Sequence, residues 1–124
     1  MPGHNHGHAA ADGPLVFDPT IHGQVTALLG GDRTRSLLLM LRSLVMMLAG
    51  LGDASLLSPA GLASIHRLKS EAGLMGFVRL SEACAAFDEP GQGTSPHGRG
   101  IAELRSAIAA TLLVTGELMG SVED

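Results

Sequence analysis

Apolar side chains recur every three or four residues along most of this chain, and this spacing is typical of amphipathic helices. It predicts helices over about residues 19–29, 33–49, 59–75 and 101–119, and a further one around residues 80–87. No strand-like alternation, internal repeat or heptad run stands out. One short helix followed by four longer ones predicts an all-α fold, an antiparallel four-helix bundle with an additional short N-terminal helix.

The ends of the predicted helices carry recognisable signals. Asp18-Pro19 and Ser58-Pro59 each place a capping side chain before a proline at the first helical position. Gly30-Gly31 is expected to end the first helix, and Asp32 is placed to cap the second. Gly76 is placed to end the helix that begins at residue 59.

The segment 33–49 differs from the other predicted helices because it is apolar on nearly all sides. Such a helix is either central in the bundle or partly covered by a partner. Residues 89–100 are rich in glycine and proline and are predicted to form a loop. Residues 1–16 are rich in glycine and histidine and are expected to be a disordered tail, which leaves residues 17–124 as one helical bundle domain.

The composition narrows the class of protein. The 124 residues suffice for one domain, and 45% of them are hydrophobic. The chain has no Trp or Tyr and only three Phe, so its core is expected to be aliphatic. A net charge of −4 and the lack of a basic stripe argue against a nucleic-acid partner. A single cysteine, Cys84, excludes an intrachain disulfide.

No segment predicts a membrane partner or secretion. The longest apolar stretch, residues 37–51, is interrupted by Arg42 and Ser43 and is too short to cross a bilayer. The N-terminal segment has no Lys or Arg, which a secretory signal requires. We therefore expect a cytoplasmic protein.

The clearest functional pattern lies in residues 62–77. With about 100° per residue on a helix, a stripe of apolar side chains falls opposite His66 and is expected to face the core: Ile65, Leu68, Ala72 and Met75. Small residues fall close to His66, with a cation on each flank: Ala63, Ser70 and Gly73, then Lys69 and Arg67. A helix that only covers a core has no need of this arrangement. A helix that offers an imidazole to a bulky partner carrying an anion does need small neighbours and nearby cations.

These residues resemble the histidine phosphotransfer (HPt) domains of bacterial multistep phosphorelays. The signature of that family is a histidine, then a hydrophobic residue two positions later, lysine three later, glycine four later, small residues and a glycine ten later. The matching positions are His66, Leu68, Lys69, Ala72 and Gly76, whereas Ser70 stands where the family usually has glycine. The specific resemblance spans about residues 62–88, in which Leu80, Cys84 and Phe87 also fit the next helix of the family.

The resemblance implies a phosphoryl carrier in two-component signal transduction. His66 would accept a phosphoryl group at Nε2 from the aspartate of one receiver domain and pass it to another, in response regulators or hybrid histidine kinases. Such a carrier has no kinase or ATPase activity of its own. It needs no cofactor or metal on this chain, because Mg²⁺ belongs to the partner receiver. No nucleic acid, membrane or small-molecule substrate is expected.

The neighbours of His66 suggest separate roles. Lys69 can offset the charge of the transferring phosphoryl group. Arg67 either helps docking or simply solvates its face, and the Ser70 hydroxyl either bonds the imidazole or phosphoryl group or narrows access to it. Leu62 and Leu74 lie towards the exposed side and are expected to offer an apolar docking surface.

Other readings of the chain are open. The bundle could be a non-catalytic interaction module that binds a signalling partner or self-associates through the apolar helix at 33–49. The tail histidines His4, His6 and His8 could bind Ni, Cu or Zn, but no carboxylate or cysteine accompanies them, so no metal site is expected. A metalloprotein within the bundle is disfavoured because the helices lack the inward Glu and Glu-x-x-His set of such sites.

Overall fold

The computed structural model describes residues 15–88 and 97–123, which form six helices and no strand. The all-α prediction is confirmed. In chain order the helices are α2 (Pro19–Leu29), α3 (Gly31–Ala49), α4 (Asp53–Leu56), α5 (Pro59–Leu74), α6 (Val78–Asp88) and α7 (His97–Glu123). No helix in this described part is both long and apolar enough to cross a membrane.

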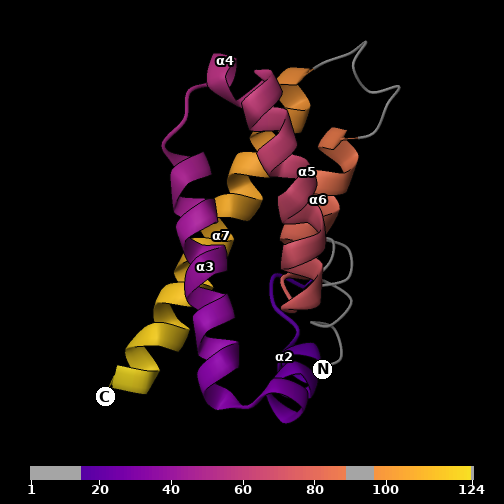
Figure 1. The fold of residues 1–124 in the computed structure, drawn as a ribbon. Helices are drawn as coiled ribbons and strands as arrows, with labels where there is room; N and C mark the ends of the chain where they lie inside the picture. Colours follow the sequence, from indigo (N-terminus) through magenta and orange to yellow (C-terminus); the bar gives the residue numbers. More distant parts are fainter. Residues whose placement is uncertain (1–14, 89–96, 124) are drawn as a thin grey trace, which may run out of the picture.

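Four of these helices form a bundle (Figure 1). Helices α3 and α6 run in one direction, and α5 and α7 run in the other. Each packs on its two antiparallel neighbours, in the cyclic order α3, α5, α6, α7. The short α2 packs against α3 at one end of the bundle, and α4 joins α3 to α5 at the other. This is the antiparallel four-helix bundle with an additional N-terminal helix that the hydrophobic spacing predicts.

The two cap-and-proline signals form as predicted. The Asp18 carboxylate accepts a hydrogen bond of 2.9 Å from the backbone N–H of Thr20, at the start of α2. The Ser58 hydroxyl accepts one of 3.1 Å from the backbone N–H of Gly61, at the start of α5. Both side chains satisfy a donor that has no partner within its own helix.

The predicted cap at Asp32 is wrong. Gly30, with φ of +91°, is both the residue that ends α2 and the residue that precedes α3, and it makes no side-chain cap bond. Because Gly30 alone separates the two helices, α3 begins at Gly31 and Asp32 already lies in its first turn. Its carboxylate there complements the positive end of the helix dipole.

The loop prediction for residues 89–100 is wrong in its last part. Residues 97–100 form the first turn of α7, and residues 89–96 lie outside the described structure. The glycines in this stretch suggested a loop, but Gly100 has a packing reason to be glycine. A Cβ there would lie 3.2 Å from the Phe87 ring of α6. Helix α7 also runs further than predicted, to Glu123.

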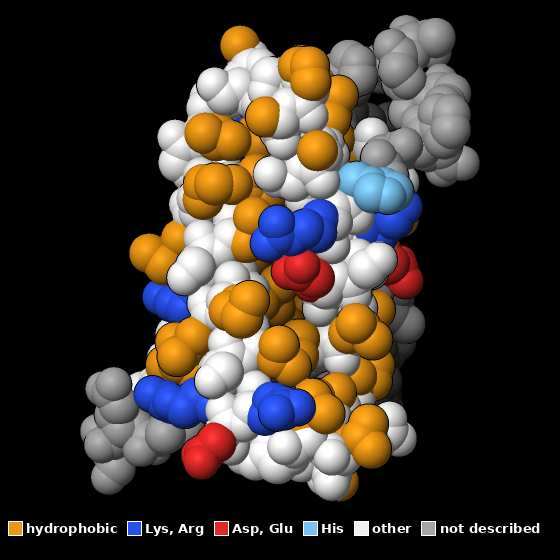
Figure 2. Space-filling model, viewed as in Figure 1, with side chains coloured by type: hydrophobic (Ala, Val, Ile, Leu, Met, Phe, Trp, Pro, Cys, Tyr) orange, Lys and Arg blue, Asp and Glu red, His pale blue; other side chains and the backbone are white. Residues whose placement is uncertain are grey.

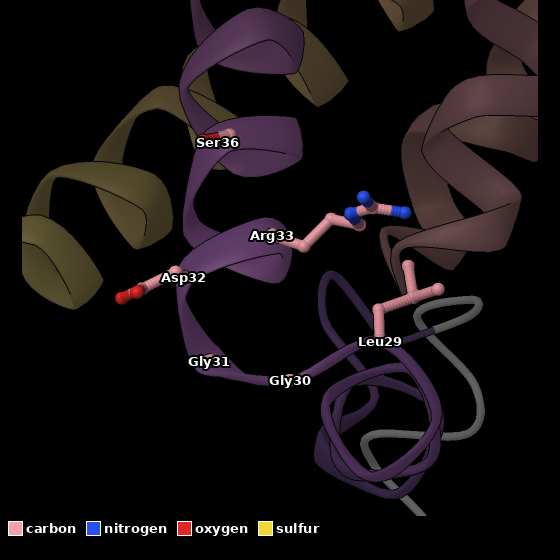
Figure 3. Close-up of a pocket in the computed structure, with 6 residues that line it drawn as sticks. All are labelled: Leu29, Gly30, Gly31, Asp32, Arg33 and Ser36. Carbon is pink, nitrogen blue, oxygen red and sulfur yellow. The ribbon is translucent and has the colours of Figure 1, made fainter.

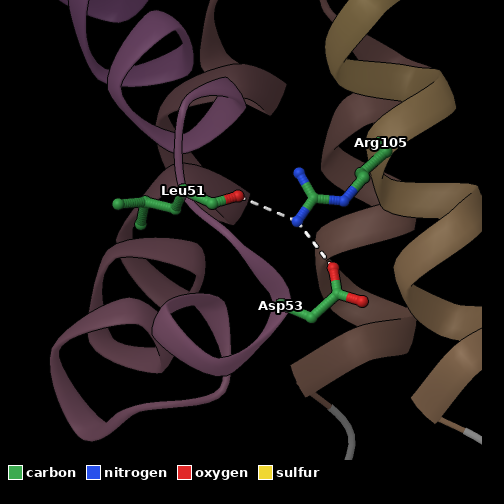
Figure 4. A network of polar contacts seen from close by, with 3 residues as sticks. All are labelled: Leu51, Asp53 and Arg105. Atoms are coloured by element: carbon green, nitrogen blue, oxygen red, sulfur yellow. Dashed lines mark hydrogen bonds and ion pairs between the residues drawn. The ribbon is translucent and has the colours of Figure 1, made fainter.

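Helix α4 was not predicted from the sequence because one turn is too short to show a period. It needs the glycine at position 61, since a Cβ there would overlap the backbone carbonyl oxygens of Ser55 and Leu56. The segment that joins α3 to α5 is held to α7 by Arg105 (Figure 4). Its guanidinium donates to the Leu51 carbonyl at 2.9 Å and to the Asp53 carboxylate at 2.7 Å.

The core is aliphatic, as predicted, with Phe77 as its largest side chain. Helix α3 contributes one face of it, through Leu38, Leu41, Leu44, Val45 and Leu48. The sequence left two predictions for residues 33–49, a central helix or a helix partly covered by a partner. The prediction of a central helix is wrong, because α3 buries only one of its faces. Its opposite face exposes Leu39, Met40, Met46 and Met47 to solvent.

The turn between α5 and α6 anchors the start of the domain. Gly76 takes a φ of +93°, and its carbonyl accepts a hydrogen bond of 2.7 Å from the backbone N–H of Asp18. A Cβ at Gly76 would lie 2.9 Å from the Asp18 carbonyl oxygen, so both the backbone angle and the close approach favour glycine. The Leu15 carbonyl likewise accepts from the Arg79 N–H at 3.0 Å, so the packed chain includes residue 15, before the predicted boundary at 17.

Candidate functional site

Helix α5 presents His66 on its outer side. The apolar side chains predicted to face the core are all buried, namely Ile65, Leu68, Ala72 and Met75. Residues opposite this stripe must point away from the bundle, and His66 is exposed. Since α5 packs on both α3 and α6, the buried stripe fixes the rotation of the helix and therefore the direction of the imidazole.

The open face around His66 is built from small and apolar residues. Ala63 precedes His66 by three residues, Ser70 follows it by four, and both are exposed. Leu62 and Leu74 are also exposed, by 39% and 69%. The small residues one turn before and after the histidine are thus Ala63 and Ser70, whereas Leu62 and Lys69 are its larger neighbours on α5.

Gly73 does not belong to the open face. It is half-buried at the seam between α5 and α6, where a Cβ would lie 3.1 Å from the Ser81 hydroxyl oxygen. That hydroxyl is held in place because it donates a hydrogen bond of 2.8 Å to the Lys69 carbonyl. The small size of Gly73 therefore has an internal explanation in helix packing, which the sequence pattern alone did not reveal.

The two cations lie on opposite flanks of α5. Lys69 is half-buried on the α6 side, next to the Ser81 contact. Arg67 lies on the α3 side and forms an ion pair of 2.9 Å with Glu71, one turn later, with the two side chains 63% and 39% exposed. Sequence reasoning missed Glu71, although acid and base four residues apart on a helix are a known pairing signal.

Arg67 also lines a shallow hollow between α3 and α5. Its other lining residues are Met40, Ser43, Leu44, Met47 and Ser64, and its volume is about 460 Å³. The exposed side chains of Met40 and Met47 on α3 thus lie next to the side of α5 that carries Arg67. Figure 2 shows hydrophobic side chains recurring over the α3 side of this face, with basic and acidic side chains between them.

A second open hollow, of about 590 Å³, lies at the junction of α2 and α3. Figure 3 shows that its two charged residues, Asp32 and Arg33, point to opposite sides of α3. A binding site needs polar groups that converge on one point. This hollow does not provide them.

No described part of the chain brings together three or more His, Cys, Asp or Glu side chains in a metal-binding group. Cys84 is a buried core residue. His4, His6 and His8 lie outside the described residues, so the structure does not bear on the tail histidines.

No family model, curated protein or solved structure matches this chain. The functional argument therefore rests on the residues and their geometry. What the site offers chemically is an accessible imidazole, which can act as a nucleophile, on a helix with small neighbours and a lysine on one flank.

Proposed function

We propose that this protein is a histidine phosphotransfer protein, which carries a phosphoryl group on His66 between the aspartates of receiver domains. The observation that carries the proposal is the exposed position of His66 between Ala63 and Ser70, on a helix fixed by four buried side chains. A receiver cleft must close around the imidazole to reach it, and small residues one turn away leave room for that cleft. The protein would act in the cytoplasm, without kinase or ATPase activity of its own.

The transfer step is a displacement at phosphorus. The Nε2 lone pair of His66 attacks the phosphorus of an aspartyl phosphate, and a P–N bond forms as the P–O bond to the aspartate breaks. The carboxylate leaves with the bonding electron pair, and the Nδ1 proton stays on the ring. No water or ATP is consumed. Mg²⁺ bound by the receiver would neutralise charge on the phosphoryl oxygens.

Lys69 supports the same step. It follows His66 by three residues, so the two side chains are neighbours on the helix surface. An ammonium group there can offset the negative charge of the phosphoryl group as it transfers. Arg67 is less suited to this role, because its guanidinium is already paired with Glu71.

The proposal is tested by incubating the full chain with receiver domains of the same organism, each charged with labelled phosphate. Wild type should acquire label that is lost in acid and kept in base, as expected of a phosphoramidate. His66→Gln should acquire none, whereas His22→Gln, which removes a histidine of α2, should label like wild type. Label retained by His66→Gln, or no label on wild type from any receiver, would overturn the proposal.

One observation favours an alternative, a non-catalytic interaction module. Leu39, Met40, Met46 and Met47 form an exposed apolar face on α3, and exposed apolar groups of this kind mark surfaces that bind partners. If this face binds a signalling partner while His66 is never phosphorylated, the alternative replaces the carrier function. The two are distinguished by the labelling experiment above.

A further inference from the structure

A small, half-enclosed hollow lies among α2, α3 and α7, away from the outer face of α5. Its volume is about 180 Å³. All three helices contribute residues to its wall: His22, Thr26, Gly31, Thr34, Arg35, Leu38, Leu118 and Met119. The wall thus combines basic groups and hydroxyls with aliphatic side chains.

Two residues of this wall each carry a nitrogen atom that is buried without a hydrogen bond. Nδ1 of His22 and one terminal nitrogen of Arg35 each have less than 1 Å² of exposed surface and find no partner within the described residues. A guanidinium is always charged and its N–H groups can only donate. Leaving such a donor buried and unsatisfied is costly, so a group that accepts from it would bind favourably.

The two threonine hydroxyls of this wall are not hydrogen-bond partners of these nitrogens. The Thr26 hydroxyl donates to the His22 carbonyl at 2.9 Å, and the Thr34 hydroxyl donates to the Gly30 carbonyl at 2.8 Å. No aspartate or glutamate is among the residues that line the hollow. The acceptor that would satisfy Arg35 and His22 is therefore absent from the wall itself.

The rest of the wall selects against a purely polar occupant. Leu38, Leu118 and Met119 make part of this wall apolar. An inorganic anion would leave that part uncovered. The volume of about 180 Å³ is also below the range of roughly 300–1,000 Å³ for sites that hold drug-sized ligands.

We propose that this hollow binds a short aliphatic carboxylate. The carboxylate accepts from the Arg35 guanidinium and from His22 Nδ1, and the hydrocarbon chain packs on Leu38, Leu118 and Met119. The site is partly preformed, because the His22 ring is held by the ring of Phe17, at 5.4 Å between centroids. Phe17 in turn packs on Phe77 of the core, at 5.0 Å.

Titration of the full chain with hexanoate, followed by NMR of methyl groups, tests this site. Hexanoate should shift the methyl signals of Leu38 and Met119 in a saturable manner. Hexanamide, which has the same length but no charge, should bind at least about tenfold more weakly, since charge-assisted hydrogen bonds are the stronger ones. Inorganic phosphate should cause no saturable shift.

Substitutions locate the interaction at one side chain. Arg35→Gln should weaken hexanoate binding at least about tenfold. Arg33→Gln, two residues earlier on the same helix and exposed, should bind hexanoate like wild type. Circular dichroism would check that both variants fold.

Three outcomes would overturn the proposal. They are the lack of saturable shifts in wild type, equal affinities for hexanoate and hexanamide, and equal loss of binding in both arginine variants. The first does not depend on any variant folding. None depends on His66, so this site and the phosphotransfer function can fail separately.

Discussion

At the scale of single residues, the surroundings of His66 divide into two kinds. Ala63 and Ser70 are exposed, so packing within the described chain does not explain their small size, and the proposed docking of a receiver domain would. Gly73 is small because the Ser81 hydroxyl lies against it. The same sequence property therefore has a packing cause at Gly73, while at Ala63 and Ser70 a cause in partner docking follows only from the proposed function.

Lys69→Ala should slow phosphoryl transfer about fivefold, because a unit charge about 4 Å away in water contributes about 1 kcal/mol. Its effect on the free energy of unfolding should be small, under about 0.5 kcal/mol. Arg67→Ala is the matched control and should leave the transfer rate nearly unchanged, since Arg67 is paired with Glu71. Single-turnover transfer from a charged receiver measures both rates. Equal slowing in the two variants would show that Lys69 has no specific role.

Ser70→Phe should block receiver docking, because a ring at this position stands beside the imidazole where the partner must close. Ser36→Phe places the same ring on an exposed site of α3 and should leave docking unchanged. Ser70→Gly should retain or speed transfer. Binding is measured by titrating a receiver into each folded variant. Normal docking by Ser70→Phe would mean that this face is not the docking surface.

Gly73→Ala brings two opposing effects on stability. Alanine favours the helix by roughly 1 kcal/mol over glycine, but its Cβ would press on the Ser81 oxygen at 3.1 Å. We expect the contact to offset most or all of the helical gain. Adding Ser81→Ala should restore that gain relative to Ser81→Ala alone, a coupling that urea denaturation of the four variants measures. Additive effects would show that Ser81 does not constrain Gly73.

At the scale of elements, α3 shows where an apolar pattern misleads. The segment 33–49 is apolar on nearly all sides, yet only the face with Leu38, Leu41 and Leu48 is buried. Hydrophobic periodicity tells which residues can be buried, but not how many neighbours a helix has. In this bundle α3 has its neighbours on one side, so several of its apolar residues stay exposed to solvent, among them Leu39, Met40, Met46 and Met47.

Leu41→Ala should therefore destabilise the protein by about 2–5 kcal/mol, the usual cost of truncating a buried leucine. Met40→Ala is the neighbouring control and should cost under about 0.5 kcal/mol, because Met40 is 63% exposed whereas Leu41 is 2% exposed. Chemical denaturation measures both. A Leu41→Ala cost below about 1 kcal/mol would contradict the assignment of the buried face. Weakened self-association in Met40→Ala would instead support the interaction module.

The remaining elements show which sequence signals were sufficient. Helix starts at Asp18 and Ser58 were predictable because capping is local chemistry between residues two or three apart. Helix α4 and the first turn of α7 were not, since they depend on contacts with distant residues, such as Gly100 against Phe87. The buried stripe of α5 followed from spacing alone. The ion pair at Arg67 was also visible in the spacing but was overlooked.

At the scale of the whole molecule, the bundle would act in the proposed function as a support for the exposed imidazole of His66. The outer face of α5 carries His66, the α3 face offers apolar surface, and the hollow among α2, α3 and α7 lies apart from both. The first two are formed by residues that the core leaves exposed, whereas the hollow is also lined by Leu38 of the core. The proposed functions are thus separate consequences of one packing arrangement, and each can be tested without disturbing the others.

The central claim is that His66 itself carries the phosphoryl group. The most direct measurement is NMR of the chain after phosphorylation by a receiver, kept at alkaline pH, in which phosphorus–imidazole coupling identifies the modified nitrogen and residue. The predicted result is a single phosphoramidate signal coupled to the His66 ring, at Nε2. Coupling to a different histidine, or a phosphoryl group attached to a serine, threonine or carboxylate, would contradict the claim.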